Sequence, residues 1–381
     1  MRTLQRWLDG TGDLRALVPL RIAAGPLVLL HLRPFLADAI DGRIYADTFW
    51  QPYASWYPEL PRAGYVALLW VTAVAAVALS AGLFTRVVAI VTAAGVAYNL
   101  FLSQTHFHHN RAFLLIVLIG LAVLPVGRWG SVDAMLRRRA VPAPAPLWPL
   151  GLLRFEVAVA YWASGLSKLI DGDWWGGLVT RLRIEQYGDL AASRGVPDWM
   201  LEIAGNAGFH WWFAKVVVLT ELAIGVGLFW RRTRLVSVWL AIGFHLAIEA
   251  FADVQVFSLA GLAALVIWVT PRSGDRILTV HTGNRSARRL AAAVRWLDWT
   301  GRFTVTTAGG TGRPAATLID RPGADGTPVI RTGRDAVVMV LRRLPVTFWA
   351  AALVPIRTER RRPPSSTGEV RAAASVEGVG G

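Results

Sequence analysis

Eight apolar stretches dominate the first 270 residues of the chain and constrain its fold more than any other feature. A membrane-spanning helix needs about 20 apolar residues, because it rises about 1.5 Å per residue through a hydrocarbon core about 30 Å thick. The stretches are continuous rather than alternating, so they indicate helices and not the strands of a membrane barrel. They cover residues 17–36, 64–83, 87–105, 111–126, 150–169, 213–230, 235–248 and 256–270.

The composition supports a membrane protein. Hydrophobic residues make up 54% of the chain, and the mean hydropathy is +0.43, which soluble domains rarely reach. Many of the 18 tryptophans flank the apolar stretches, as expected for side chains at the membrane–water interface. The chain has no cysteine, which excludes disulfides, zinc–thiolate sites and thiol chemistry. We therefore predict an all-α, polytopic bundle of about eight transmembrane helices over residues 1–275.

The connections between the stretches predict the orientation of the bundle. Arginines lie before the first stretch, after the eighth, and in the connections 2–3, 4–5 and 6–7, whereas the connections 1–2, 5–6 and 7–8 contain balancing acids. By the positive-inside rule, both termini of this multi-pass protein are expected in the cytoplasm, with the bundle in the plasma membrane. The net charge of +15 then reflects topology and contact with membrane lipids, and we expect no nucleic-acid partner.

An unusual set of polar residues falls on the predicted outer side. Lys168 ends the fifth stretch, where an ionisable residue indicates either function or a side chain that reaches to the headgroups. Glu221, inside the sixth stretch, needs a partner such as Lys215 or a residue of another helix. The long connection 171–212 also faces outward and is expected to fold back onto the membrane face. The other residues of this set are His106, His108, His109, Asn110, His245, Glu249 and Asp253.

The residues His245, Glu249 and Asp253 follow one another at intervals of four, so they share one stripe of a helix. One histidine and two carboxylates could bind a divalent cation, with the loop histidines completing the shell. Polar stripes at helix ends are more often simply solvated, and we expect no metal.

Four motifs occur in a characteristic order. They are R-W-G-S-V-D-A-M-L (128–136), Y-W-A-S-G-L-S-K-L (161–169), T-E-L-A-I-G-V-G-L-F (220–229) and F-H-x₁₁-F-S (244–258). In order and approximate spacing they resemble the membrane domain of the vitamin K-dependent γ-carboxylases and their bacterial HTTM (horizontally transferred transmembrane) relatives. The resemblance covers the third to eighth stretches well and the first two loosely.

The resemblance implies a catalytic site. Lys168 matches the lysine that acts as the base in the oxygenation of reduced vitamin K, and His245 matches a histidine of the carboxylases. A third family histidine falls near His109 or Asn110, and an ungapped count favours Asn110, which is a departure. The implied cofactor is a reduced lipid quinone, either menaquinol or vitamin K hydroquinone. Other residues expected to line the site are Tyr161, Gly165, Trp174, Glu221 and Glu249.

The chemistry of Lys168 can also be argued from its surroundings. An apolar site favours the neutral amine, which can take a proton from a quinol hydroxyl or from a carbon acid. The small residues Ser164, Gly165 and Ser167 allow a neighbouring helix or a flat ring to approach closely. We therefore expect Lys168 to face an outward-opening apolar cavity near His245.

The composition changes after Arg276. Strands at 277–280 and 302–307, a helix at 288–299, a hairpin from T-L-I-D to P-V-I-R-T-G, and a helix at 335–343 predict a small α/β, thioredoxin-like domain over 276–356. The run H-T-G-N-R-S-A-R (281–288) resembles the Y-D-G-D-C-x-x-C opening of DCC-type thiol–disulfide oxidoreductases. Arg285 and Arg288 replace both cysteines, so this domain is expected to dock or stabilise. Residues 357–381 are expected to be a disordered basic tail.

Three functions remain open at this point. The first is a quinol-dependent, carboxylase-like or oxygenase-like membrane enzyme with Lys168 as its base. The second is a non-catalytic scaffold or peptide-maturation factor, whose protein or peptide partner is unknown. The γ-carboxylase β-rich domain that binds propeptides is missing, so carboxylation of protein glutamate does not carry over. The third is a transporter that uses Lys168 and Glu221 as a charge pair.

Overall fold

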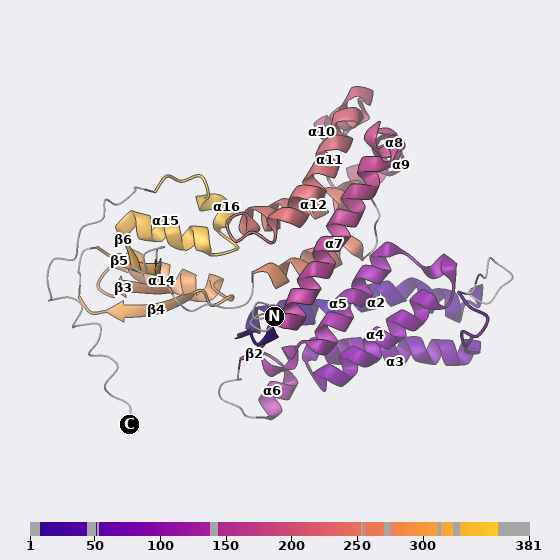
Figure 1. Ribbon diagram of the computed structural model, residues 1–381, viewed down its shortest axis with the longest axis horizontal. Helices are drawn as coiled ribbons and strands as arrows, with labels where there is room; N and C mark the ends of the chain where they lie inside the picture. Colours follow the sequence, from indigo (N-terminus) through magenta and orange to yellow (C-terminus); the bar gives the residue numbers. More distant parts are fainter. Residues whose placement is uncertain are drawn as a thin grey trace.

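The computed structural model describes residues 8–43, 51, 53–137, 144–252, 254, 256–269, 276–310, 314–322 and 328–356. These residues form a large helical part and a small α/β part at the C-terminal side (Figure 1). Residues 357–381, for which a disordered tail was predicted, lie outside the described residues.

A helix occurs at each of the eight apolar stretches. Four candidate spans, Arg15–Ile40, Arg62–Ala81, Gly208–Gly227 and Arg234–Phe251, are long and apolar enough to cross a membrane. Helix α7 has 23 residues, but Arg154, Glu156 and Lys168 lower its hydropathy. A crossing by all eight therefore stays a prediction. The helices are α2 (Val18–Ile40), α3 (Arg62–Ala81), α4 (Thr85–Phe101), α5 (His109–Val123), α7 (Trp148–Ile170), α11 (Ala207–Gly227), α12 (Arg234–Phe251) and α13 (Phe257–Ala264), which η5 (Leu265–Trp268) continues.

The predicted outer connection 171–212 is largely helical. It contains α8 (Gly172–Trp175), α9 (Leu178–Ser193) and α10 (Asp198–Gly205), and α11 then begins at Ala207, earlier than the apolar stretch suggested. Helix α9 packs against α11 and α12, so this connection is part of the bundle wall rather than an open loop.

Connections that were predicted to share the arginine-rich side meet at one end of the bundle. The short strand β1 (Thr11–Gly12) pairs with β2 (Ala145–Pro146), which joins the start of the chain to the start of α7. The guanidinium of Arg21 donates to the carbonyl of Gly130 at 2.5 Å. This arrangement agrees with the alternation of sides along the chain.

Asp133, in the motif 128–136, has a structural role at this same end. Its carboxylate accepts hydrogen bonds from the backbone N–H of Phe84 at 2.8 Å and of Thr85 at 2.9 Å, and from the Thr85 hydroxyl at 2.9 Å. These bonds satisfy N–H groups at the start of α4, which is the usual work of a capping residue. Burial alone would raise the pKa of Asp133, but the three hydrogen bonds outweigh it and lower the pKa.

The C-terminal part folds around its own core, which includes Leu278, Val280, Leu318 and Val340. Its sheet has the order β4-β3-β5-β6, in which β4 is parallel to β3 and the other neighbours are antiparallel. The β-α-β and then β-β-α order is the predicted one, and the thioredoxin-like classification stays a prediction. The elements are β3 (Arg276–His281), α14 (Arg285–Leu297), β4 (Phe303–Ala308), β5 (Ala316–Pro322), β6 (Pro328–Thr332), α15 (Gly333–Arg343) and α16 (Phe348–Ala351).

Helix α14 starts at Arg285 rather than at the predicted residue 288. The side chain of Asn284 accepts hydrogen bonds from the backbone N–H groups of Ser286 and Ala287, so the helix begins at this cap. Arg285 and Arg288, at the positions of the DCC cysteines, are both exposed on its first turn.

We predict that Asp133→Ala lowers the stability of the bundle by about 1–2 kcal/mol, because the start of α4 loses its cap. Since the folded-state pKa of Asp133 is depressed, the stabilisation is present above the unfolded pKa and is lost as pH falls through the lower folded value. Unfolding of the detergent-solubilised protein at several pH values measures both effects. Met135→Ala, at an exposed position of the same motif, serves as the control. Equal stabilities of the two variants would contradict the capping role.

Candidate functional site

Lys168 and Glu221 form an ion pair between α7 and α11. The Lys168 ammonium donates to both carboxylate oxygens of Glu221 at 2.7 Å, and to the hydroxyl of Ser164 at 2.5 Å. The two side chains are only 15% and 5% exposed. Lys168 is therefore not a lysine that reaches to the headgroups, because its charged group is turned into the bundle.

The sequence around Lys168 allows this contact. Gly165 lies against Leu222 and the Cβ of Glu221, and a side chain at Gly165 would collide with Leu222. Ser164, one turn before Lys168, donates to the Glu221 carboxylate at 3.0 Å. The small residues of this motif thus bring α7 close enough to α11 for the pair to form.

Trp174 covers the pair from the outer connection. Its ring centroid lies 5.0 Å from the Lys168 Nζ, a distance at which the ring attracts a cation. The position of Trp174 is set by Asp171, whose carboxylate accepts from the N–H groups of Asp173 and Trp174 and so begins α8. The predicted lining residues Gly165, Trp174 and Glu221 are therefore gathered around Lys168.

A second polar pair lies further along the same face of α7. The Tyr161 hydroxyl and the Nε2 of His245, on α12, are 2.8 Å apart, and both side chains are buried. The His245 ring lies against Gly261, and its centroid is 5.6 Å from that of Phe257. Helix α7 carries one member of each polar pair on a single stripe, because the i, i+3, i+4, i+7 pattern holds for Tyr161, Ser164, Gly165 and Lys168.

A small cavity separates the two pairs. Its volume is about 20 Å³, which is enough for about one water molecule. The lining contains Glu221 and Ser164 but not Lys168, and the expectation that Lys168 itself faces an apolar cavity stays a prediction. The His245 Nδ1 has no hydrogen-bond partner among the described residues. The lining residues are Phe113, Ala160, Tyr161, Ser164, Glu221, Phe244, His245, Phe257 and Gly261.

Three predicted site residues are used elsewhere. His109 is exposed and its ring packs edge-on against Phe107, at 5.4 Å between centroids. The side-chain amide of Asn110 donates to the carbonyl of Val254 at 3.0 Å, which ties α5 to the segment before α13. Glu249 lies at the C-terminal end of α12, where its backbone carbonyl accepts from Arg194.

Two further expectations concerned the partner of Glu221 and a metal site. Glu221 pairs with a residue of another helix, Lys168, and not with Lys215, which donates to the carbonyls of Trp175 and Trp211. In the described part of the chain, no three His, Asp or Glu side chains gather to hold a metal ion. Asp253 lies outside that part.

Sequence reasoning missed a buried polar cluster between α2, α3 and α4. The Nε2 of His31 lies 3.4 Å from the amide nitrogen of Asn99, whose side-chain oxygen accepts from Tyr65. His31 and Asn99 are buried polar residues inside apolar stretches, and a strongly polar residue within such a stretch is the signal that could have found them.

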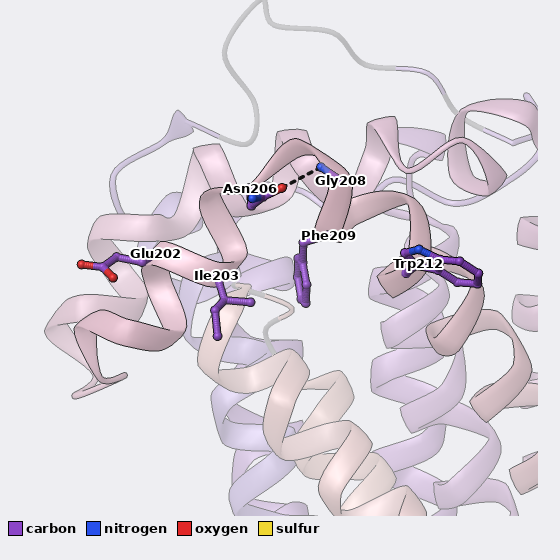
Figure 2. A pocket seen from close by; sticks show the side chains of 6 residues that line it. All are labelled: Glu202, Ile203, Asn206, Gly208, Phe209 and Trp212. Atoms are coloured by element: carbon purple, nitrogen blue, oxygen red, sulfur yellow. Dashed lines mark hydrogen bonds between the residues drawn. The ribbon is translucent and has the colours of Figure 1, made fainter.

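A larger hollow lies at the corner between α10 and α11. It has a volume of about 500 Å³ and opens broadly to the surface. Figure 2 shows the Asn206 side chain engaged in a hydrogen bond to the Gly208 N–H, at 2.9 Å, while Glu202 points away from Phe209. Among the described residues that line the hollow, Glu202 is the one charged side chain, so the hollow lacks the paired polar groups that surround Lys168.

We predict that Lys168→Met lowers stability by about 3–5 kcal/mol, because it leaves the Glu221 carboxylate buried without a partner. The double substitution Lys168→Met with Glu221→Gln is expected to recover most of this loss, since neither charge remains. Chemical unfolding of the purified protein provides the comparison. If the single and double variants lose equal stability, the two side chains do not interact energetically.

The family model of the HTTM domain matches residues 11–272, a range that contains all eight apolar stretches and both polar pairs. No solved structure matches the chain. The match covers well over half of the chain, and the helices are apolar, as expected of a multi-pass membrane protein. The chain therefore belongs to the HTTM domain family.

Proposed function

We propose that the protein is a membrane-integral, γ-carboxylase-like enzyme that takes a proton from a membrane-dissolved hydroquinone at Lys168. The observation that carries the proposal is the short, buried Lys168–Glu221 ion pair at the outer end of α7, with Trp174 over the ammonium. A charge pair of this kind costs desolvation free energy, so its presence in an apolar bundle supports a functional role.

The pair can make a base from a lysine that carries a proton. If a proton of the ammonium moves along its hydrogen bond to the Glu221 carboxylate, a neutral amine and a carboxylic acid result. Neither group then carries a charge, which a surrounding of low polarity favours. The amine can accept the hydroxyl proton of a substrate, and the ammonium that forms stabilises the negative charge left on the substrate oxygen. Ser164 orients both groups of the pair.

A hydroquinone has to meet Lys168 from its exposed side. The cavity beyond Glu221, at about 20 Å³, is far too small for an aromatic ring. The partly exposed Lys168 and the ring of Trp174 offer instead a flat surface next to the amine, on which another aromatic ring can stack. A reduced lipid quinone supplies an acidic hydroxyl on such a ring.

The small cavity suits a proton path. One water molecule in it has Glu221, Ser164, Tyr161 and His245 as hydrogen-bonding neighbours, which are as many polar partners as a buried water requires. A proton held by Glu221 can then pass to the Tyr161–His245 pair, which would restore the Glu221 carboxylate beside the Lys168 ammonium. In this role His245 moves protons and does not touch the substrate.

The same ion pair favours one other function, a transporter driven by protonation of Glu221. A transporter needs a polar path to both faces of the membrane, whereas an enzyme needs none on the arginine-rich side.

We also infer eight crossings with both termini in the cytoplasm, from the alternation of basic and acid-balanced connections. A reporter fused after Gly381 that is active only outside the cell would contradict this topology.

We predict that Lys168→Arg abolishes hydroquinone-dependent activity while the protein keeps its fold. Arginine keeps the ion pair with Glu221, but it does not release its proton at any accessible pH. The assay is chromatographic detection of oxidised product from vitamin K hydroquinone, under air, with the protein in lipid vesicles. Lys215→Arg is the matched control, because Lys215 is the only other lysine of the chain and its contacts are backbone carbonyls.

The activities of these variants distinguish the enzyme from the transporter. If the wild type and Lys215→Arg are active and Lys168→Arg is inactive, the result supports Lys168 as the base. Full activity of Lys168→Arg would contradict it. No activity in a folded wild type, with a proton flux across the vesicle membrane that depends on Glu221, would favour the transporter.

A further inference from the structure

The segment after α15 exposes a stripe of apolar side chains that nothing in the described structure covers. Leu353 is 95% exposed and Trp349 is 63% exposed, and Val346 and Ala350 are exposed beside them. Trp349 and Ala350 lie in α16 (Phe348–Ala351), Val346 lies just before this helix and Leu353 just after it. We call these four residues the anchor face. A water-facing domain gains nothing from displaying such a stripe, so the anchor face points to a binding partner.

The anchor face is held in place and does not hang loosely. Arg342, in the last turn of α15, donates to the carbonyl of Ala351 at 2.8 Å and to that of Ala352 at 3.0 Å. The hydroxyl of Thr347 donates to the carbonyl of Leu341 at 2.8 Å. These bonds fasten α16 to the α/β domain, so the domain presents the anchor face in a fixed direction.

A contact with α12 gives the position of the anchor face along the axis of that helix. The indole N–H of Trp239 donates to the carbonyl of Pro345 at 2.8 Å, and the rings of Trp239 and Trp349 are 6.4 Å apart between centroids. Figure 1 shows α16 beside the start of α12. Trp239 comes five residues after Arg234, about 7.5 Å along the helix axis.

The length of α12 then places that contact at the membrane border. Its 18 residues reach about 27 Å, slightly less than the hydrocarbon core that a spanning helix crosses. Where α12 crosses the membrane, no turn of it can project far into the water. Trp239, about 7.5 Å from its start, then lies no further out than the edge of the hydrocarbon core, and Trp349 beside it lies close to the lipid.

The neighbouring connection has the chemistry of a lipid-binding surface. Phe229 and Trp230 are exposed between α11 and α12, and the exposed cations Arg231 and Arg232 follow them. No acid occurs between residues 222 and 248, so this end of the two helices is purely basic. Tryptophan next to arginine is the usual composition of a segment that contacts anionic lipid headgroups.

We propose that the anchor face inserts into the interfacial layer of the leaflet that faces the α/β domain, and that anionic lipids are its partner. The domain is thus fixed to the membrane at two places, through η5 and α12 in the bundle and through Trp349 and Leu353 in the lipid. This role needs no thiol, which suits a domain with arginines at the two DCC cysteine positions. It does not depend on the proposed enzymatic function.

The absence of cysteine from the chain makes a direct test possible. Leu353→Cys in the full-length protein is labelled with a nitroxide and placed in vesicles that contain phosphatidylglycerol. Collision with oxygen, which dissolves in lipid, is compared with collision with a water-soluble nickel complex. Val346→Cys is a second probe of the anchor face. Thr307→Cys, exposed on the edge strand β4, is the control for a water-facing position of the same domain.

We expect the labels at 353 and 346 to collide more with oxygen than with nickel, and the label at 307 to show the opposite order. Equal nickel access at 353 and 307 would overturn the proposal, because the anchor face would then lie in water. Protection of the label at 353 from both reagents would also overturn it, since a second copy of the protein would then cover the face.

Discussion

The ion pair between Lys168 and Glu221 is the interaction on which the architecture of the site depends. Two opposite charges in an apolar bundle are tolerable only when they meet, because either one alone would be buried without compensation. Their meeting requires α7 and α11 to approach closely, and Gly165 and Ser164 provide the space and the third hydrogen bond. The same stripe of α7 then brings Tyr161 to His245 on α12. One close helix contact thus aligns two polar pairs around a cavity for one water.

The motifs at the two ends of the bundle differ in role: one stabilises the fold and the other forms the candidate site. At the arginine-rich end the motif 128–136 serves structure, because Asp133 caps α4 and Gly130 accepts from Arg21. At the other end the motif 161–169 supplies the polar groups of the candidate site.

Much of the bundle could be predicted from sequence, since hydropathy alone located the eight helical stretches. The HTTM relationship also followed from four motifs. Hydropathy could not show that the connection 171–212 contains α8 to α10, because the helix α9 is polar and is stabilised by packing on α11 and α12. Lys168 could be recognised by its position, and its pairing with Glu221 was part of the transporter hypothesis. The sequence could not show that the pair forms, because a contact between distant helices leaves no trace in spacing. Spacing also could not show that His109 and Asn110, in the first turn of α5, contact Phe107 and the carbonyl of Val254, and their role as site residues stays a prediction.

The central claim is that Lys168 shares a proton with Glu221 and meets a hydroquinone. With only two lysines in the chain, nitrogen-15 NMR of the lysine side chains reports it directly. The account predicts that the Lys168 signal shifts on Glu221→Gln and again on addition of a reduced quinone, while the Lys215 signal stays in place. A Lys168 signal that is typical of a water-exposed ammonium, and that neither change affects, would contradict the account.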